Sequence, residues 1–148
     1  MIALIQRVDR ASVEIDGKVH SKIGKGFLIL LGVRKSDSRE NAEALAAKTS
    51  MLRIFQDEEG KMNRSLKDTG GEALVVSQFT LCTDNGKSGN RPSFTEAAAP
   101  EMAEDLYNYF AECLELNLGK GKVGKGVFAA MMKVELVNDG PVTIILEK

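Results

Sequence analysis

The chain has 148 residues, of which 43% are hydrophobic and 28% charged, so it can bury the core of one ordinary domain without disulfides. Its 20 basic and 21 acidic residues leave a formal net charge of -1, which gives no overall basic field to indicate nucleic acid. With two cysteines and one histidine, His20, the chain cannot build a His-rich or Cys-rich zinc site, and a Ser-His-Asp triad would depend on His20 alone. We therefore expect no metal and no cofactor, and we expect His20 to be exposed on a strand.

The first part of the chain predicts strands. Residues 2–8 (IALIQRV) alternate as a strand does, and residues 12–23 form a hairpin with Asp16-Gly17 at its tip. Residues 26–33 (GFLILLGV) are continuously apolar, which indicates a central strand covered on both faces. No apolar run approaches the roughly 18 residues of a membrane span, and the N-terminus lacks a signal-peptide pattern. We therefore expect a cytoplasmic protein that has no membrane partner.

The middle of the chain changes to a helical period. Residues 36–55 carry apolar side chains at helical spacing, and Asp37 with Glu40 has the pattern of a capping box. Residues 57–61 (DEEGK) predict a turn, and residues 62–71 (MNRSLKDTGG) predict an irregular loop. One long helix is therefore expected before the chain returns to strand.

The rest of the chain alternates between strand, loop and helix. The expected segments are a strand over 72–82, a loop over 83–94, a helix that opens at Pro100 and ends near 116, a flexible connection over 117–126, and two strands over 127–137 and 142–147. Together the segments predict one α+β domain over residues 1–148, with a mostly antiparallel, barrel-like sheet and two main helices packed on it.

Two glycine-rich stretches imitate phosphate-binding motifs without the context that those motifs need. GKGKVG at 119–124 matches G-x-G-x-x-G, but it follows a predicted helix and precedes a strand, the reverse of the dinucleotide fold. NGKSG at 85–89 resembles the end of a P-loop, but Leu81 stands where the earlier glycine belongs. Neither stretch predicts a nucleotide cofactor. Cys82 and Cys113 fit small buried apolar groups.

Three other stretches are candidates for chemistry. Ser77, Gln78 and Thr80 interrupt a core-like strand near its end, where sites are common, although solvent exposure would explain them as well. Residues 128–132 (FAAMM) form a wall of small and soft side chains, which suits a core or an adaptable pocket. Pro141 removes a backbone donor where a strand should start pairing, which a simple hairpin turn does not need.

Taken together, SQFTL, RPSF and LVNDGPVT, in this order and near these separations, resemble the D-aminoacyl-tRNA deacylase family, also called D-tyrosyl-tRNA deacylase. The resemblance runs from IALIQRV to NDGPVT and so covers the whole chain. It implies a homodimeric cytoplasmic hydrolase whose partner is the aminoacylated 3′ end of tRNA. Such an enzyme cleaves the ester between a D-amino acid and the terminal adenosine, and it also removes glycine mischarged onto tRNA.

The resemblance also implies roles for particular residues. Gly140-Pro141 would have a cis peptide bond and would reach into the partner's pocket, where it would exclude L-amino acids, with Arg7 as an anchor beside it. Backbone N–H groups of residues 78–80 would stabilise the oxyanion, while the ribose 2′-hydroxyl assists cleavage. The expected catalytic residues are Ser77, Gln78, Phe79 and Thr80, and the expected substrate-binding residues are Gly140, Pro141, Arg7, Asn138, Phe128, Ala129, Ala130 and Met132.

Other mechanisms and functions remain open at this point. Thr80 as a nucleophile is an alternative to the RNA-assisted route, although the sequence offers it no base. A dimeric module that binds RNA ends or a small ligand without cleavage would use the same pocket, and so would a Ser or Thr hydrolase that attacks with Ser77 or Thr80. The chain departs from the family pattern at Lys125 and Met131, where members often carry threonine and an acidic residue.

Overall fold

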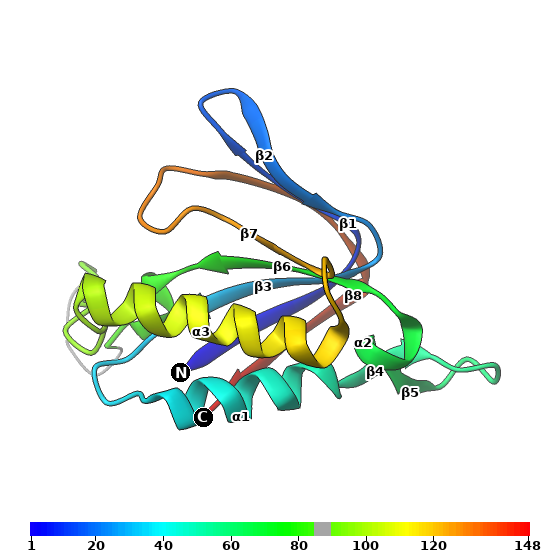
Figure 1. Cartoon of the computed structure of the whole chain (residues 1–148). Coiled ribbons are helices and arrows are strands. Elements are labelled where there is room, and N and C mark those ends of the chain that lie inside the picture. The colour runs from blue at the N-terminus through cyan, green and yellow to red at the C-terminus, as the bar shows by residue number, and fades with distance from the viewer. Residues whose placement is uncertain (85–89) are drawn as a thin grey trace.

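The computed structural model describes residues 1–84 and 90–148, and its centre is a curved mixed sheet (Figure 1). The sheet order is β2-β1-β3-β6-β7, and β8 pairs with β1. Three pairings of β1 are antiparallel, whereas β3 with β6 and β6 with β7 are parallel. Its strands are β1 (Ile2–Ile15), β2 (Lys18–Ile23), β3 (Gly26–Gly32), β6 (Glu72–Ser77), β7 (Val123–Lys125) and β8 (Lys133–Glu147).

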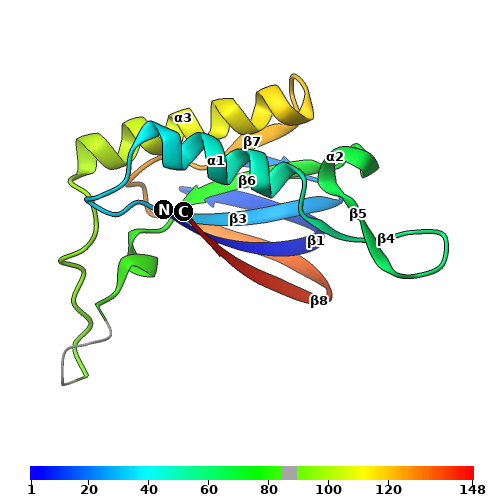
Figure 2. The same cartoon turned by 90° about the horizontal axis from the view of Figure 1, so that it is seen from below.

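Two long helices cover one face of this sheet (Figure 2). They are α1 (Arg39–Ser50) and α3 (Pro100–Leu118). A short helix, α2 (Leu66–Thr69), follows a separate hairpin of β4 (Arg53–Gln56) and β5 (Met62–Ser65). The expected α+β class, with a mostly antiparallel barrel-like sheet and two main helices, is therefore confirmed. Within the described ranges, no helix is long and apolar enough to cross a membrane.

The central strand β3 separates two apolar clusters because successive side chains point to opposite faces. Phe27 and Leu31 pack toward the helices with Leu45 of α1 and Phe110 of α3. Leu28 points the other way, into a second apolar cluster whose other members come from β1, β2 and β6, with side chains of β8 packed against it. The continuous apolar run of β3 thus has the buried two-sided position that its sequence predicted.

The start of α1 differs from the predicted capping box. Ser38 is the N-cap, and its backbone N–H donates to Asn41 Oδ1 at 2.9 Å. Asp37 instead accepts a hydrogen bond from the α-amino group of Met1 at 2.6 Å and from the Arg34 N–H at 2.6 Å. The carboxylate that the sequence places at a helix cap therefore holds the amino terminus against the β3–α1 connection.

Element ends are the main places where the sequence predictions were wrong. The helix expected over 36–55 ends at Ser50, and the irregular loop expected over 62–71 is β5 and α2. The strand expected over 72–82 ends at Ser77 and is followed by the 3-10 turn η1 (Phe79–Cys82). The connection expected over 117–126 contains β7. Residues 127–132 form no strand. These short elements depend on a neighbouring strand or helix, which local sequence does not reveal.

The last two predicted strands are one strand. β8 continues from Lys133 to Glu147 through Gly140-Pro141, because β1 is long enough to pair with both halves. The register between β1 and β8 shifts between Gln6 and Val8 and again between Val8 and Arg10. At this irregularity Pro141 is not paired with a residue of β1, so its missing N–H breaks no ladder hydrogen bond. Pro141 therefore lies within an irregular ladder, whereas the sequence predicted that residues 138–141 separate two strands.

Candidate active site

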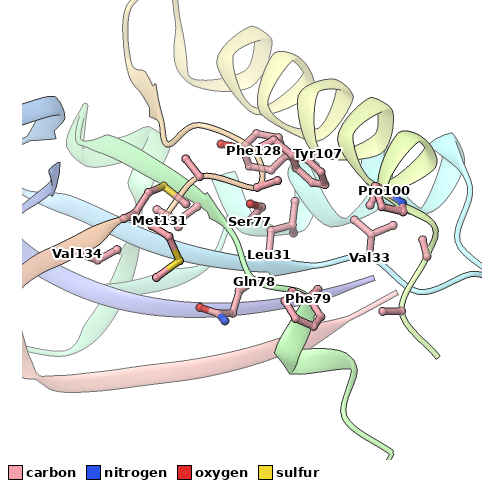
Figure 3. Close-up of a pocket in the computed structure, with 17 residues that line it drawn as sticks. Leu31, Val33, Ser77, Gln78, Phe79, Pro100, Tyr107, Phe128, Met131 and Val134 are labelled. Atoms are coloured by element: carbon pink, nitrogen blue, oxygen red, sulfur yellow. The ribbon is translucent and has the colours of Figure 1, made fainter. Parts of the chain in front are cut away.

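A cavity of about 600 Å³ opens where β6 ends, close to the first turns of α3 and to the segment that joins β7 to β8 (Figure 3). Its walls are mostly apolar, and they come from four separate parts of the chain. The lining residues are Leu31, Val33, Val76, Ser77, Gln78, Phe79, Ala97, Ala98, Pro100, Ala103, Tyr107, Phe128, Ala129, Ala130, Met131, Met132 and Val134. The volume is in the range of pockets that enclose a small molecule or a nucleoside.

The end of β6 supplies backbone donors at one side of this cavity. The Gln78 N–H donates to the Leu31 carbonyl at 2.8 Å, so it is occupied by the sheet. The N–H groups of Phe79 and Thr80 begin the turn η1 and have no acceptor among the described residues. Of the three backbone donors expected to bind an oxyanion, two are therefore available and that of Gln78 is not.

Thr80 lies beside the cavity without lining it. Its hydroxyl oxygen accepts a hydrogen bond from Gln78 Nε2, and its carbonyl accepts one from the Thr83 hydroxyl. An amide N–H donates and cannot take up a proton, so Gln78 is no general base for Thr80. This contact instead fixes the orientation of both side chains at the rim.

The opposite wall is a turn tied to β6 through a tyrosine. The Tyr107 hydroxyl lies 2.9 Å from the Val75 carbonyl and 3.2 Å from the Gly126 carbonyl, and the Gly126 N–H also donates to Val75 at 2.9 Å. Phe128 packs against Tyr107 with ring centroids 6.1 Å apart, and Ala129 adopts a positive φ of 58° in the turn that follows. The expected pocket residues Phe128, Ala129, Ala130 and Met132 all line the cavity.

The cavity contains no charged side chain in the part of the wall that the structure describes. Its lining includes no His, Asp, Glu, Lys or Arg. The pKa of Tyr107 is raised to about 12, chiefly by burial, so its hydroxyl is neutral at physiological pH. In the described ranges, no cluster of three His, Cys, Asp or Glu side chains could hold a metal ion. The described walls can thus bind and position an apolar or stacked group, but they offer no general base.

The Gly140-Pro141 peptide bond is cis, and both residues are exposed above a buried arginine. Arg7 is 6% exposed; its Nε lies 3.2 Å from the Asp139 carbonyl and 3.0 Å from Asp139 Oδ2, and its guanidinium also donates to the Ile54 carbonyl. Asn138 Oδ1 accepts the Val142 N–H at 2.9 Å. The Gly140-Pro141 segment of β8 is therefore held by hydrogen bonds from Arg7 to Asp139 and from the Val142 N–H to Asn138.

The cavity of the same chain is not lined by Arg7, Asn138, Gly140 or Pro141. On the shared strand β3, Arg7 pairs with Phe27 whereas Ser77 pairs with Leu31, so about 13 Å of strand separates the two places. The structure thus brings the 77–79 and 128–132 candidates together and leaves Arg7, Asn138, Gly140 and Pro141 elsewhere.

Several lining residues were missed from the sequence. Tyr107, Ala103 and Pro100 share one face of α3 at spacings of three and four, a signal that could have indicated a second, pocket-lining stripe beside the buried one. Met131, at which the chain departs from the family pattern, is 92% exposed at the rim. His20, Cys82 and Cys113 lie as expected: the histidine is exposed on β2 and the cysteines are buried.

Comparison with known proteins decides the family. The model of the D-Tyr-tRNA(Tyr) deacylase family matches residues 4–147. The chain belongs to this family. Membership confirms the resemblance seen in the sequence and the expectation of an enzyme.

Full-length relatives agree with this assignment, and two solved structures share the fold. The chain is 58% identical to the D-aminoacyl-tRNA deacylase of Roseiflexus castenholzii, over 99% of this chain and 92% of the relative. It is 59% identical to that of Thermomicrobium roseum, over 99% and 94%. A structure of c-Myc DNA Unwinding Element Binding Protein superposes with a TM-score of 0.94 at 43% identity, covering 100% of this chain and 99% of that one. A probable eukaryotic D-amino acid tRNA deacylase, 16% identical over 99% of this chain and 98% of that one, shares the fold with a TM-score of 0.81.

Proposed function

We propose that the protein hydrolyses the ester that joins a D-amino acid to the 3′-terminal adenosine of tRNA, releasing the free D-amino acid and tRNA. The family assignment supports this reaction. The observation that carries the mechanism is an apolar cavity whose described lining has no charged group, beside two backbone N–H groups that have no acceptor among the described residues. Such a site contributes position and oxyanion stabilisation, so the substrate must contribute the rest.

The terminal adenosine would occupy the wall formed by Phe128, Ala129, Ala130 and Met132, where an aromatic face and small residues leave room for a flat base. This places the ester near the end of β6. Water attacks the carbonyl carbon, the oxyanion accepts hydrogen bonds from the Phe79 and Thr80 N–H groups, and the 3′-oxygen leaves as a hydroxyl. The neighbouring ribose 2′-hydroxyl orients the water and relays its proton, which explains why no side-chain base is needed.

Selection against L-amino acids requires a second copy of the chain. Gly140 and Pro141 are exposed, rigidly held and too far from their own cavity to act there. In a homodimer the pair would enter the partner's cavity and occupy the space that an L side chain needs. Arg7 would anchor this gate. Glycine has no side chain, so glycine mischarged onto tRNA would also be cleaved.

The exposed β8 edge and Ile145, which is 60% exposed, provide a surface on which such a dimer could form. Because aminoacyl-tRNA is made and used in the cytoplasm, the proposal places the protein there. A nucleic-acid-binding role beside the hydrolysis is the second candidate, since the similar structure at 43% identity is named c-Myc DNA Unwinding Element Binding Protein.

Single-turnover cleavage tests these points together. The substrates are D-Tyr-tRNA and L-Tyr-tRNA, each with a normal or a 2′-deoxy terminal adenosine. We expect rapid cleavage of the D form alone, and its loss without the 2′-hydroxyl. Cleavage that persists on the 2′-deoxy substrate would assign the chemistry to Thr80 or Ser77, and binding without any cleavage would leave a recognition module.

A further inference from the structure

A second cavity, of about 460 Å³, lies at the tip of the β1–β2 hairpin. It is lined by Ile15, Asp16, Lys18, Val19, His20 and Val127. None of these residues has a part in the ester cleavage described above. The cavity is large enough to enclose one nucleoside, and its lining combines apolar, cationic, anionic and aromatic groups.

The two cavities are separated by one turn of the chain. Val127 lines the second cavity and Phe128 lines the first, and consecutive Cα atoms are about 3.8 Å apart. The Ala130 N–H closes this turn on the Val127 carbonyl at 3.3 Å, which directs the two side chains into different cavities. In Figure 1 the β1–β2 hairpin and the β7–β8 connection project on the same side of the molecule. A single strand of RNA whose last base is in the first cavity can therefore place its preceding nucleotide in the second.

The lining of the second cavity matches a nucleotide better than a simple ion. Asp16 and Lys18 carry opposite charges, so the cavity gives no net field for a free phosphate or a cation. Neither side chain has an ion-pair partner in the described ranges, unlike the nearby Lys25 with Asp9 and Lys133 with Glu14. The exposed Val19 and the His20 ring provide a surface on which a base can stack.

We propose that this cavity binds the nucleotide immediately before the terminal adenosine of the RNA substrate. In tRNA that nucleotide is a cytidine, because the 3′ end reads CCA. A carboxylate is the acceptor that suits the exocyclic amino group of cytosine, and this is the role of Asp16. Lys18 contacts the phosphate that links the two nucleotides, while His20 and Val127 pack against the base. This inference rests on the proposed deacylation and extends it to a second subsite.

Short substrates test the subsite directly. D-tyrosine is esterified to adenosine, to the dinucleotide CpA and to UpA, and kcat/KM is measured for each. We expect the CpA ester to be cleaved about tenfold more efficiently than the adenosine ester, because a stacked base contributes that order of affinity. UpA lacks the cytosine amino group and should lie between them. Equal values for all three esters would overturn the proposal.

Three variants locate the effect. Asp16 has a φ of 50°, so Asp16→Gly removes the carboxylate while the turn geometry remains accessible. It should abolish the preference for CpA over UpA, while Lys18→Gln should lower the efficiency of both dinucleotide esters about threefold and leave the adenosine ester unchanged. Lys48→Gln, an exposed lysine on α1, is the matched control and should behave as the wild type. A loss that is the same in all three substrates would indicate general misfolding and contradict a subsite.

Binding can also be measured without any turnover. His20 is the only histidine in the chain, so its imidazole NMR signals are unambiguous. Unacylated CpA should shift these signals and adenosine should not. If no ester is cleaved but CpA still shifts His20, the proposed function fails and the subsite stands. If the esters are cleaved and His20 is unmoved by CpA, the subsite is wrong and the deacylase stands.

Discussion

The hydroxyl of Tyr107 connects α3 to two walls of the cavity, and Tyr107→Phe removes this hydroxyl while it keeps the ring. The ring is 2% exposed, and its hydroxyl contacts the Val75 and Gly126 carbonyls at 2.9 and 3.2 Å. Without the hydroxyl, Val75 keeps the Gly126 N–H at 2.9 Å, whereas the Gly126 carbonyl loses the partner that the structure shows for it. One buried acceptor is thus left unsatisfied, which costs about 1 to 2 kcal/mol of the free energy of unfolding.

Urea denaturation measures this cost, and Tyr109→Phe is the matched control. Tyr109 is the only other tyrosine, and its ring lies 4.8 Å from the Arg39 guanidinium carbon, a contact that phenylalanine preserves. The control should change the free energy of unfolding by less than about 0.5 kcal/mol. If both variants lost the same amount, or if Tyr107→Phe lost nothing, the hydroxyl would not be what holds the turn before Phe128.

The same tyrosine predicts a pH dependence. Burial raises the pKa of Tyr107 from 10.0 to about 12, so the unfolded chain loses this proton at lower pH than the folded chain. Below pH 10 the ionisation of Tyr107 therefore does not change the free energy of unfolding of the wild type. As the pH rises from 10 toward 12, this free energy falls by roughly 2 to 3 kcal/mol in total. Tyr107→Phe removes this part of the decline, so the difference between the two proteins should shrink or reverse above pH 10. A constant difference would refute the buried-hydroxyl argument.

Three further predictions concern packing and the site. A Cβ at Gly26 would lie 1.7 Å from the Glu72 carbonyl oxygen, so Gly26→Ala should lower the free energy of unfolding, measured by urea denaturation, by more than about 4 kcal/mol. The control is Gly60→Ala, whose Cβ would meet no atom within 4 Å. It should lower the same free energy by about 1 kcal/mol, because Gly60 has a φ of +77°. Arg7→Lys removes the planar guanidinium that contacts both the Asp139 and the Ile54 carbonyls. It should lower the ratio of kcat/KM for the D substrate to that for the L substrate at least about tenfold, with kcat for the D substrate less affected. An unchanged ratio would exclude Arg7 as the anchor of Gly140-Pro141. Phe128→Leu keeps an apolar wall but loses the aromatic face, and it should raise KM for D-Tyr-tRNA about tenfold with little change in kcat, so an unchanged KM would mean that the base does not stack there.

The spacing of apolar residues predicted the long helices and strands well, because this spacing is a local property of the sequence. The alternation of residues 2–8 and 12–23, the apolar run of β3 and the helical spacing after Pro100 each led to an element of the expected kind. Element ends were less predictable. Residues 72–82 read as one strand, yet β3 ends at Gly32 and leaves Phe79 without a neighbour to pair with, so the chain turns after Ser77.

The candidate site was predicted in part for a related reason. The motifs SQFTL and NDGPVT identified the family, and residues 77–79 and 128–132 do share one cavity. Tyr107 was not identified, because a tyrosine on a helix shows neither its burial nor its two carbonyl partners in the sequence. The Gln78 N–H was expected to be available, but its pairing with Leu31 is a contact between strands far apart in the chain.

By itself, the sequence determined the fold class, the family and the absence of enough histidine or cysteine for a zinc site, because these follow from composition, period and short motifs. Only the tertiary structure decided that β8 passes unbroken through Gly140-Pro141, that this pair lies away from its own cavity, and that Val127 and Phe128 line different cavities. The reason is physical: these features depend on which distant strands pair and where the register of β1 and β8 shifts. Such pairing energies belong to contacts between segments, and no single segment carries them.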